Sequence, residues 1–226
     1  MIEIYVMDIS PLRDRELYGL AYSKLSEDRQ RKALRIKRDD ERIRSVGASL
    51  LLEYVLGKRG VSEFVYSYGK HGKPCLAGRE DIRFNISHSG ERVMCALSDT
   101  PVGCDVERVS AVATGLEKRV LTVREIDIYE RLDGREKTFF RFWTAKESFI
   151  KAIGEGMSVS LGDIEIFLGE SEKRVNPVRF SGNTETGYYV KEYDLSDPYR
   201  YACCSTEDSF PETMTVIYVK QIIEEM

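Results

Sequence analysis

The pattern of apolar and polar residues in the first half of the chain predicts a strand, then helices, then further strands. Residues 2–9 are mostly apolar and end before Pro11, which predicts the first strand. Residues 26–56 favour a helix that begins at Ser26 as N-cap and carries apolar residues at helical spacing in its second half. Three further strands are predicted over residues 64–68, 82–86 and 92–97. Residues 87–90 form the connection between the last two of these strands.

The second half of the chain repeats this mixture of helices and strands. Residues 123–132 and 138–153 have the spacing of helices, and short strands are predicted over residues 164–167, 178–180, 188–193, 199–204 and 214–219. Residues 92–98 and 200–205 are similar in sequence, which is weak evidence for a duplicated unit. No low-complexity segment separates the halves. We therefore expect an α+β fold in which residues 1–101 and 102–226 form two subdomains with a shared interface.

The composition indicates a folded protein without disulfide or zinc scaffolding. Of 226 residues, 42% are hydrophobic, which is enough to bury a core and excludes a disordered chain. The five cysteines are odd in number and lack C-x-x-C spacing, so we expect buried free thiols. With only two histidines, a Cys/His zinc site has little support.

Neither the N-terminus nor any apolar stretch indicates export or membrane insertion. The first five residues resemble a strand and lack the basic region of a signal peptide. Residues 46–56 are interrupted by Glu53 and are too short to span a bilayer. We expect a soluble cytoplasmic protein.

The net charge of −4 conceals a basic segment. Residues 29–44 contain eight basic and three acidic residues. Such a segment can bind an anionic ligand, or it can be a solvated helix face, and its composition alone leaves both open.

Two acidic segments suggest metal-assisted chemistry on a phosphorylated substrate. Asp105 and Glu107 alternate in a strand-like run after Pro101, so they project from the same face. Glu147 and Lys151 are four residues apart in a predicted helix and share one side of it. Three carboxylates suit Mg²⁺, and a neighbouring lysine suits phosphate oxygens. The alternatives are a surface acid pair on an edge strand and an i,i+4 salt bridge between Glu147 and Lys151.

These segments resemble the paired signatures of the 4′-phosphopantetheinyl transferases. The resemblance rests on VGCDVE at residues 102–107 and FWTAKESFIK at residues 142–151, followed by GEGM. NISHS at residues 85–89 and GKP at residues 72–74 are similar to two further family segments in the same order. Length and motif order resemble the long, monomeric type that activates surfactin synthetase.

The resemblance implies a fold, an activity and partners. The fold implied is a pseudo-two-fold pair of α+β subdomains with coenzyme A in the cleft between them. The activity implied is Mg²⁺-dependent transfer of 4′-phosphopantetheine from coenzyme A to a serine hydroxyl of an apo acyl or peptidyl carrier protein, giving holo carrier protein and 3′,5′-ADP. Neither nucleic acid nor a membrane is an expected partner.

The resemblance also implies roles for individual residues. The metal ligands implied are Asp105, Glu107 and Glu147. Glu147 also takes the serine proton, directly or through water, and Lys151 neutralises charge on the transferred phosphate. The residues implied to bind coenzyme A are Arg29, Lys32, Arg44, Ser45, Lys73, Ser87, His88 and Lys151. We assign no role to His71, and we expect Lys146 to be a helix-surface cation and Trp143 to belong to the core.

Two other function classes fit parts of the pattern. A Mg²⁺-dependent nuclease also uses clustered acids and a lysine, but Val109 occupies the position where such enzymes carry that lysine, and the acidic net charge disfavours DNA. A non-catalytic protein that binds coenzyme A or a carrier would not need three acids together with Lys151.

Overall fold

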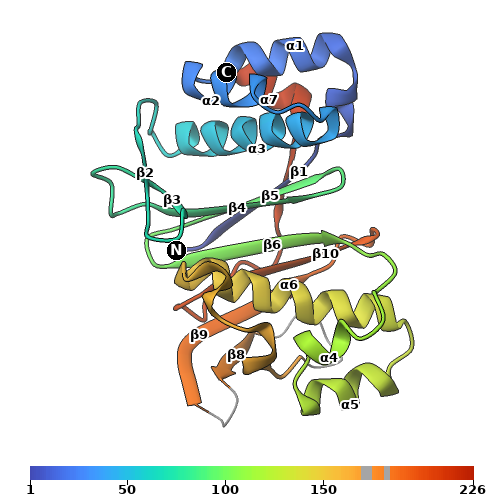
Figure 1. The fold of residues 1–226 in the computed structure, drawn as a ribbon. Coiled ribbons are helices and arrows are strands. Elements are labelled where there is room, and N and C mark those ends of the chain that lie inside the picture. The colour runs from blue at the N-terminus through green and yellow to red at the C-terminus, as the bar shows by residue number, and fades with distance from the viewer. Residues whose placement is uncertain (169–174, 181–183) are drawn as a thin grey trace.

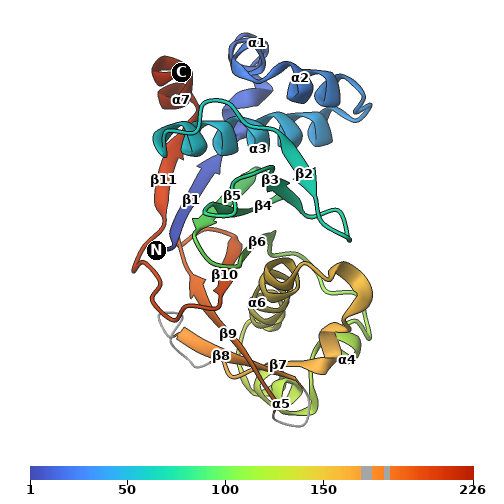
Figure 2. The same cartoon turned by 90° about the vertical axis from the view of Figure 1, so that its left-hand side faces the viewer.

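Two β-sheets face each other at the centre of the molecule, and helices cover the outer face of each sheet (Figures 1 and 2). The computed structural model describes residues 1–168, 175–180 and 184–226. The expected α+β class is confirmed, because each half combines an antiparallel core of strands with a long helix packed across it. Among the helices of these ranges, none is long and apolar enough to cross a membrane.

Within the described residues, the strands form two main sheets and one small hairpin. The first sheet has the order β11-β1-β5-β4, with β1 Glu3–Asp8, β4 Arg83–Ser89, β5 Arg92–Ser98 and β11 Thr215–Tyr218. The second has the order β6-β10-β9-β8-β7, with β6 Val102–Arg108, β7 Ile164–Ile166, β8 Val175–Phe180, β9 Thr184–Tyr193 and β10 Tyr199–Ser205. The hairpin consists of β2 Tyr66–Tyr68 and β3 Pro74–Leu76.

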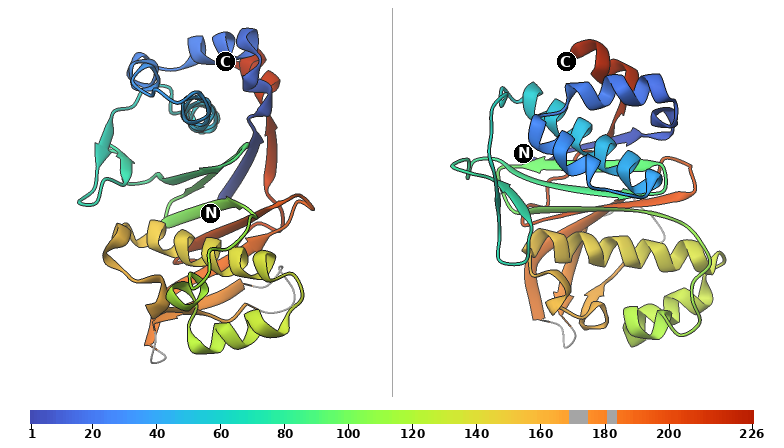
Figure 3. Two further views of the ribbon diagram at one scale, coloured as in Figure 1. Left: turned by 45° about the vertical axis from the view of Figure 1, so that its right-hand side comes forward. Right: turned by 45° about the horizontal axis from the view of Figure 1, so that its top comes forward.

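The helices divide between the two halves. On the first sheet lie α1 Arg15–Lys24, α2 Glu27–Leu34, α3 Asp39–Lys58 and α7 Val219–Glu225. A 3₁₀ turn at Ser10–Arg13 precedes α1. On the second lie α4 Glu117–Val120, α5 Val123–Arg131 and α6 Arg135–Ile153, with 3₁₀ turns at Gly156–Ser158 and Leu161–Asp163. The turn between β2 and β3 reaches the C-terminal end of α6 (Figure 3).

Three apolar layers hold these elements together. One lies between the first sheet and its helices, and another lies between the second sheet and α6. The third lies between the two sheets and is formed mainly by residues of β1, β5, β6 and β10, such as Ile4, Ala96, Val106 and Tyr201. The strand period of two explains why each strand can serve two layers. All five cysteines are free, and four of them are buried in these layers, as expected.

The last segment of the chain returns to the first half, contrary to the expected division. We expected residues 102–226 to stay together, but β11 pairs in parallel with β1, and Thr215 lies opposite Tyr5. Helix α7 then packs on α1 and α3. The first sheet thereby gains an edge strand. The division at residue 101 otherwise stays a prediction.

The long helix expected over residues 26–56 is divided in two. Helix α2 ends at Leu34 and α3 begins at Asp39. Three acids lie in the first turn of α3, and Arg31 and Lys32 lie in the last turn of α2. Both placements favour a break, because acids stabilise helix N-termini and cations stabilise C-termini.

Glu225 should tie α7 to the first half in a pH-dependent manner. Its carboxylate accepts hydrogen bonds from Tyr54 and Lys58 of α3, and these, Lys58 first, lower its pKa to about 2. A carboxyl whose folded-state pKa is depressed stabilises the fold above its unfolded pKa and loses that effect as pH falls toward the folded value. Glu225→Gln should therefore lower the melting temperature at neutral pH and have little effect near pH 2. An equal effect at both pH values in thermal unfolding would contradict this.

Candidate active site

The two sheets meet along β4 and β6, and side chains of β4 make the contact. The backbone N–H groups of Cys104, Val106 and Arg108 donate to the side chains of Asn85, Ser87 and Ser89, at 2.8, 3.4 and 3.2 Å. These three side chains share one face of β4 because they alternate along the strand. Residues 87–89 were expected in a loop, but they extend β4, and the side chains of Ser87 and Ser89 accept from N–H groups of β6.

Gly103 allows helix α6 to lie directly against β6. A Cβ atom at this position would lie 2.1 Å from the carbonyl oxygen of Ser148 and 2.3 Å from the backbone nitrogen of Ala152. No side chain fits at such distances, so only glycine permits this approach. The close packing brings Glu147 and Lys151 of α6 to the acidic residues of β6.

Asp105 is the centre of the cluster and is 2% exposed. Its Oδ1 accepts hydrogen bonds from Lys151 Nζ at 2.5 Å and from Ser87 Oγ at 2.8 Å. Lys151 also donates to Ser87 Oγ at 2.9 Å. Burial alone would lower the pKa of Lys151, but the attraction of Asp105 outweighs it and raises that pKa. Lys151 therefore stays an ammonium group. It pairs with Asp105, whereas the salt-bridge alternative required it to pair with Glu147.

Two further carboxylates face this pair. Glu107 Oε2 accepts from Ser89 Oγ at 2.6 Å. Burial, together with the negative charges of Asp105 and Glu147, raises the pKa of Glu107. Burial and Asp105 likewise raise the pKa of Glu147. Both groups thus lie close enough to the other acids to repel them, and a cation would relieve that repulsion.

The three acids offer oxygen ligands but do not form a closed metal cage. Within the described ranges, no group of three or more His, Cys, Asp or Glu side chains is gathered tightly enough to hold a metal ion. Asp105 Oδ2, however, is buried and has no hydrogen-bond partner among the residues that the structure describes. An unpartnered carboxylate oxygen beside two acids of raised pKa fits a hard cation such as Mg²⁺.

A basic pocket of about 670 Å³ opens beside one end of β4. It is lined by Lys32, Ile36, Glu41, Arg44, Ser45, His88, Ser89 and Gly90. The surrounding protein desolvates the His88 ring and lowers its pKa, and Arg44 and Lys151 act in the same direction. Four residues expected to bind coenzyme A therefore share one pocket.

Two residues expected at the same ligand do not line the basic pocket. The Arg29 guanidinium stacks on the ring of Tyr66, 3.9 Å from its centroid, and does not line the basic pocket. Lys73 donates to the carbonyl oxygens of Val102 and Ala152, both at 3.0 Å. In this position Lys73 joins the β2–β3 turn to the second half, and it lines the same pocket as Glu147 and Lys151. Its contact with a phosphate stays a prediction.

An apolar pocket of about 750 Å³ opens on the other side of the acids. Glu147 and Lys151 line it together with apolar side chains, which include Leu116, Val120, Trp143, Ile150, Val159 and Leu161. Trp143 packs against the core, as expected, and it also lines the pocket. Its place near Glu147 in the helix motif is the signal that could have indicated the pocket contact. His71 lies at the rim, with Nε2 3.4 Å from Glu155 Oε2.

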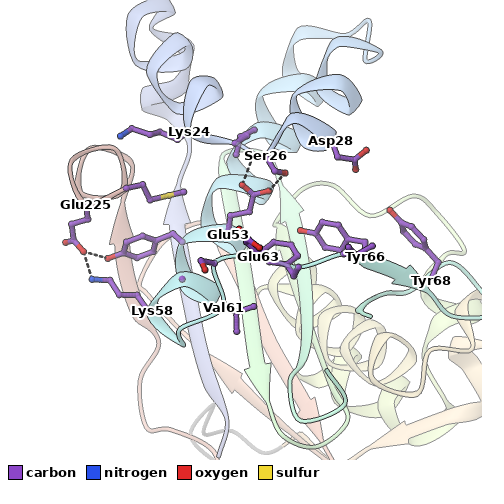
Figure 4. A pocket seen from close by; sticks show the side chains of 17 residues that line it. Lys24, Ser26, Asp28, Glu53, Lys58, Val61, Glu63, Tyr66, Tyr68 and Glu225 are labelled. Atoms are coloured by element: carbon purple, nitrogen blue, oxygen red, sulfur yellow. Dashed lines mark hydrogen bonds and ion pairs between the residues drawn. The ribbon is translucent and has the colours of Figure 1, made fainter. Parts of the chain in front are cut away.

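A cavity of about 1050 Å³ lies away from these residues, between helices α1–α3 and the strand β2 (Figure 4). Two of its carboxylates have hydrogen-bond partners in the lining: Glu53 accepts from Ser26 Oγ, and Glu225 accepts from Lys58 Nζ. None of the acids of the β6–α6 cluster lines it.

The chain is similar in sequence to known proteins of one family. The sequence profile of the 4′-phosphopantetheinyl transferase superfamily matches residues 101–204, which contain β6 and α6. The 4′-phosphopantetheinyl transferase Sfp of Bacillus subtilis (strain 168) is 28% identical over 88% of this chain and 90% of its own length. The transferase gsp of Aneurinibacillus migulanus is 28% identical over 98% and 94%. HetI of Nostoc sp. is 34% identical over 70% of this chain and 71% of its own length. The chain therefore belongs to the 4′-phosphopantetheinyl transferase superfamily.

Proposed function

We propose that this enzyme transfers 4′-phosphopantetheine from coenzyme A to a serine hydroxyl of an apo acyl or peptidyl carrier protein and releases 3′,5′-ADP. The observation that carries the proposal is the order of three features along β4. Asn85 lines the apolar pocket, Ser87 binds Asp105 and Lys151, and His88 lines the basic pocket. Coenzyme A has the same order of chemistry, with a pantetheine arm, a pyrophosphate and a 3′-phosphorylated nucleotide.

The acids would hold Mg²⁺ against the pyrophosphate. Asp105, Glu107 and Glu147 are the ligands that fit, and the bound cation would offset negative charge on the reacting phosphate. Asp105 Oδ2, which has no hydrogen-bond partner among the described residues, is the oxygen that would bind the cation.

Glu147 and Lys151 act on the two reacting groups. The raised pKa of Glu147 makes this carboxylate a better acceptor for the proton of the attacking serine hydroxyl. Lys151 remains charged and donates hydrogen bonds to the transferred phosphate, where negative charge increases during attack. That the enzyme works as a cytoplasmic monomer stays a prediction.

The basic pocket should recognise the 3′-phosphate of coenzyme A. Wild-type protein should bind coenzyme A ~10- to 100-fold more tightly than 3′-dephospho-coenzyme A, since one charge-assisted contact contributes ~1.5–3 kcal/mol. Lys32→Ala and Arg44→Ala should reduce this difference in titration calorimetry.

Lys37→Ala is the matched control. Lys37 belongs to the same basic segment and is exposed, but it does not line the pocket. Its removal should leave the ratio of the two affinities unchanged. If wild-type protein binds the two ligands equally, the basic segment is a solvated surface and this part of the proposal fails.

A further inference from the structure

Lys146 is a fully buried cation, although it precedes the site residue Glu147 and was expected on the helix surface. It is 0% exposed. Its Nζ donates to Val120 O at 2.6 Å, Glu125 Oε2 at 2.5 Å and Leu161 O at 3.1 Å. An ammonium group has three N–H donors, and here each of them has an acceptor.

Glu125 extends these contacts to two more segments. Its Oε2 accepts from the backbone N–H of Thr122 at 2.8 Å, where it completes the capping box of α5. Its Oε1 accepts from the N–H of Ile166 in β7 at 2.9 Å. Lys146 and Glu125 thus join helix α6 to α4, α5, β7 and the turn at Leu161.

Two of these partners belong to the wall of the apolar pocket. Val120 and Leu161 line it, and so do their neighbours Arg119 and Ser160. Helix α6 contributes Glu147 and Ile150 to the same lining. The bonds from Lys146 to the carbonyl groups of Val120 and Leu161 therefore fix the distance between these two lining segments and the helix that carries the acids.

Stability alone does not account for this ion pair. Removing two charges from water is costly, and a well-packed apolar pair is often at least as stable. Hydrogen bonds, however, have preferred distances and angles, so bonds to carbonyl groups on two segments fix the positions of these segments. An apolar side chain would not do so.

We propose that Lys146, held by Glu125, is a positioning residue that sets the width of the apolar pocket for the pantetheine arm of the substrate. This inference rests on the proposed function, because it assigns the arm of coenzyme A to that pocket. It also predicts that two parts of the ligand are bound by different groups. Binding of the pantetheine arm depends on the Lys146–Glu125 pair, whereas binding of the nucleotide depends on the basic pocket.

The test compares coenzyme A with 3′,5′-ADP, which lacks the arm. The double variant Lys146→Met/Glu125→Gln removes both charges and so leaves no unpaired ion. Its affinity for coenzyme A should fall by about tenfold, the effect of leaving roughly two methylene groups of the arm in water. Its affinity for 3′,5′-ADP should stay at the wild-type value in calorimetry.

A matched control removes another buried ion pair on the same helix. Arg141 Nε donates to Glu192 Oε1 at 2.8 Å, and this pair joins α6 to β9 away from the pocket. Arg141→Met/Glu192→Gln should leave the ratio of the two affinities unchanged, whatever its effect on the melting temperature.

Three results would overturn the inference: an unchanged affinity of the Lys146 variant for coenzyme A, an equal loss for both ligands, or the same change of ratio in the Arg141 control. Wild-type protein that binds neither coenzyme A nor 3′,5′-ADP would instead refute the proposed function, and this inference with it.

Discussion

Asp105→Asn is expected to reduce phosphopantetheine transfer by about 1000-fold or more. The substitution keeps the shape of the side chain but removes the charge that pairs with Lys151 and the free oxygen offered to Mg²⁺. Removal of one preorganised charge or donor from a transition state costs ~100- to 1000-fold in rate, and Asp105 serves two such groups. The measurement is single-turnover transfer to an apo carrier protein at saturating coenzyme A.

The control separates catalysis from folding. Asp105→Asn leaves the partly buried Lys151 without its ion-pair partner, which should lower stability. The double variant Asp105→Asn/Lys151→Met removes that unpaired charge and should recover much of the melting temperature without recovering transfer. If the double variant regained wild-type turnover, the cluster would be structural and not catalytic.

Gly103→Ala is expected to have the second large effect, through backbone packing. The new methyl group would lie 2.1 Å from the carbonyl oxygen of Ser148, so α6 would have to move away from β6. Such overpacking in a core typically costs ~1–3 kcal/mol, and a displacement of about 1 Å at the site can cost ~100-fold in rate. The rate of phosphopantetheine transfer should therefore fall by more than the loss of folded protein accounts for.

Gly57→Ala is the control for that prediction. Gly57 also lies in a helix, but nothing lies within 4 Å of a Cβ atom at this position. The same substitution there should raise stability by up to ~1 kcal/mol and leave transfer unchanged. Wild-type melting temperature and turnover in Gly103→Ala would show that the contact between α6 and β6 does not set the site.

Local pattern was sufficient to predict most elements and which acids share a face. The period of two placed Asp105 and Glu107 on one side of a strand, and both face serines of β4. The helical spacing predicted α6 to within three residues at its start. These features depend on neighbours in the sequence, and periodicity reports them directly.

Contacts between distant segments could not be predicted in this way. The pattern offered Glu147 as partner of Lys151, but the structure pairs Lys151 with Asp105, 46 positions earlier. Lys146 has the sequence context of a surface cation, and only the packing of α4, α5 and the turn at Leu161 around α6 buries it. The return of β11 to β1 likewise depends on which sheet edge is open, and local spacing carries no information on that.

The most direct test of the proposed activity is the mass of a carrier protein after incubation with this enzyme, coenzyme A and Mg²⁺. The account predicts that an apo carrier gains one phosphopantetheine group on its serine and that 3′,5′-ADP appears in equal amount. Chelation of the metal, or use of the Asp105→Asn variant, should prevent both. A carrier whose mass does not change, although the protein binds coenzyme A and the carrier is modified by a known transferase, would contradict the account.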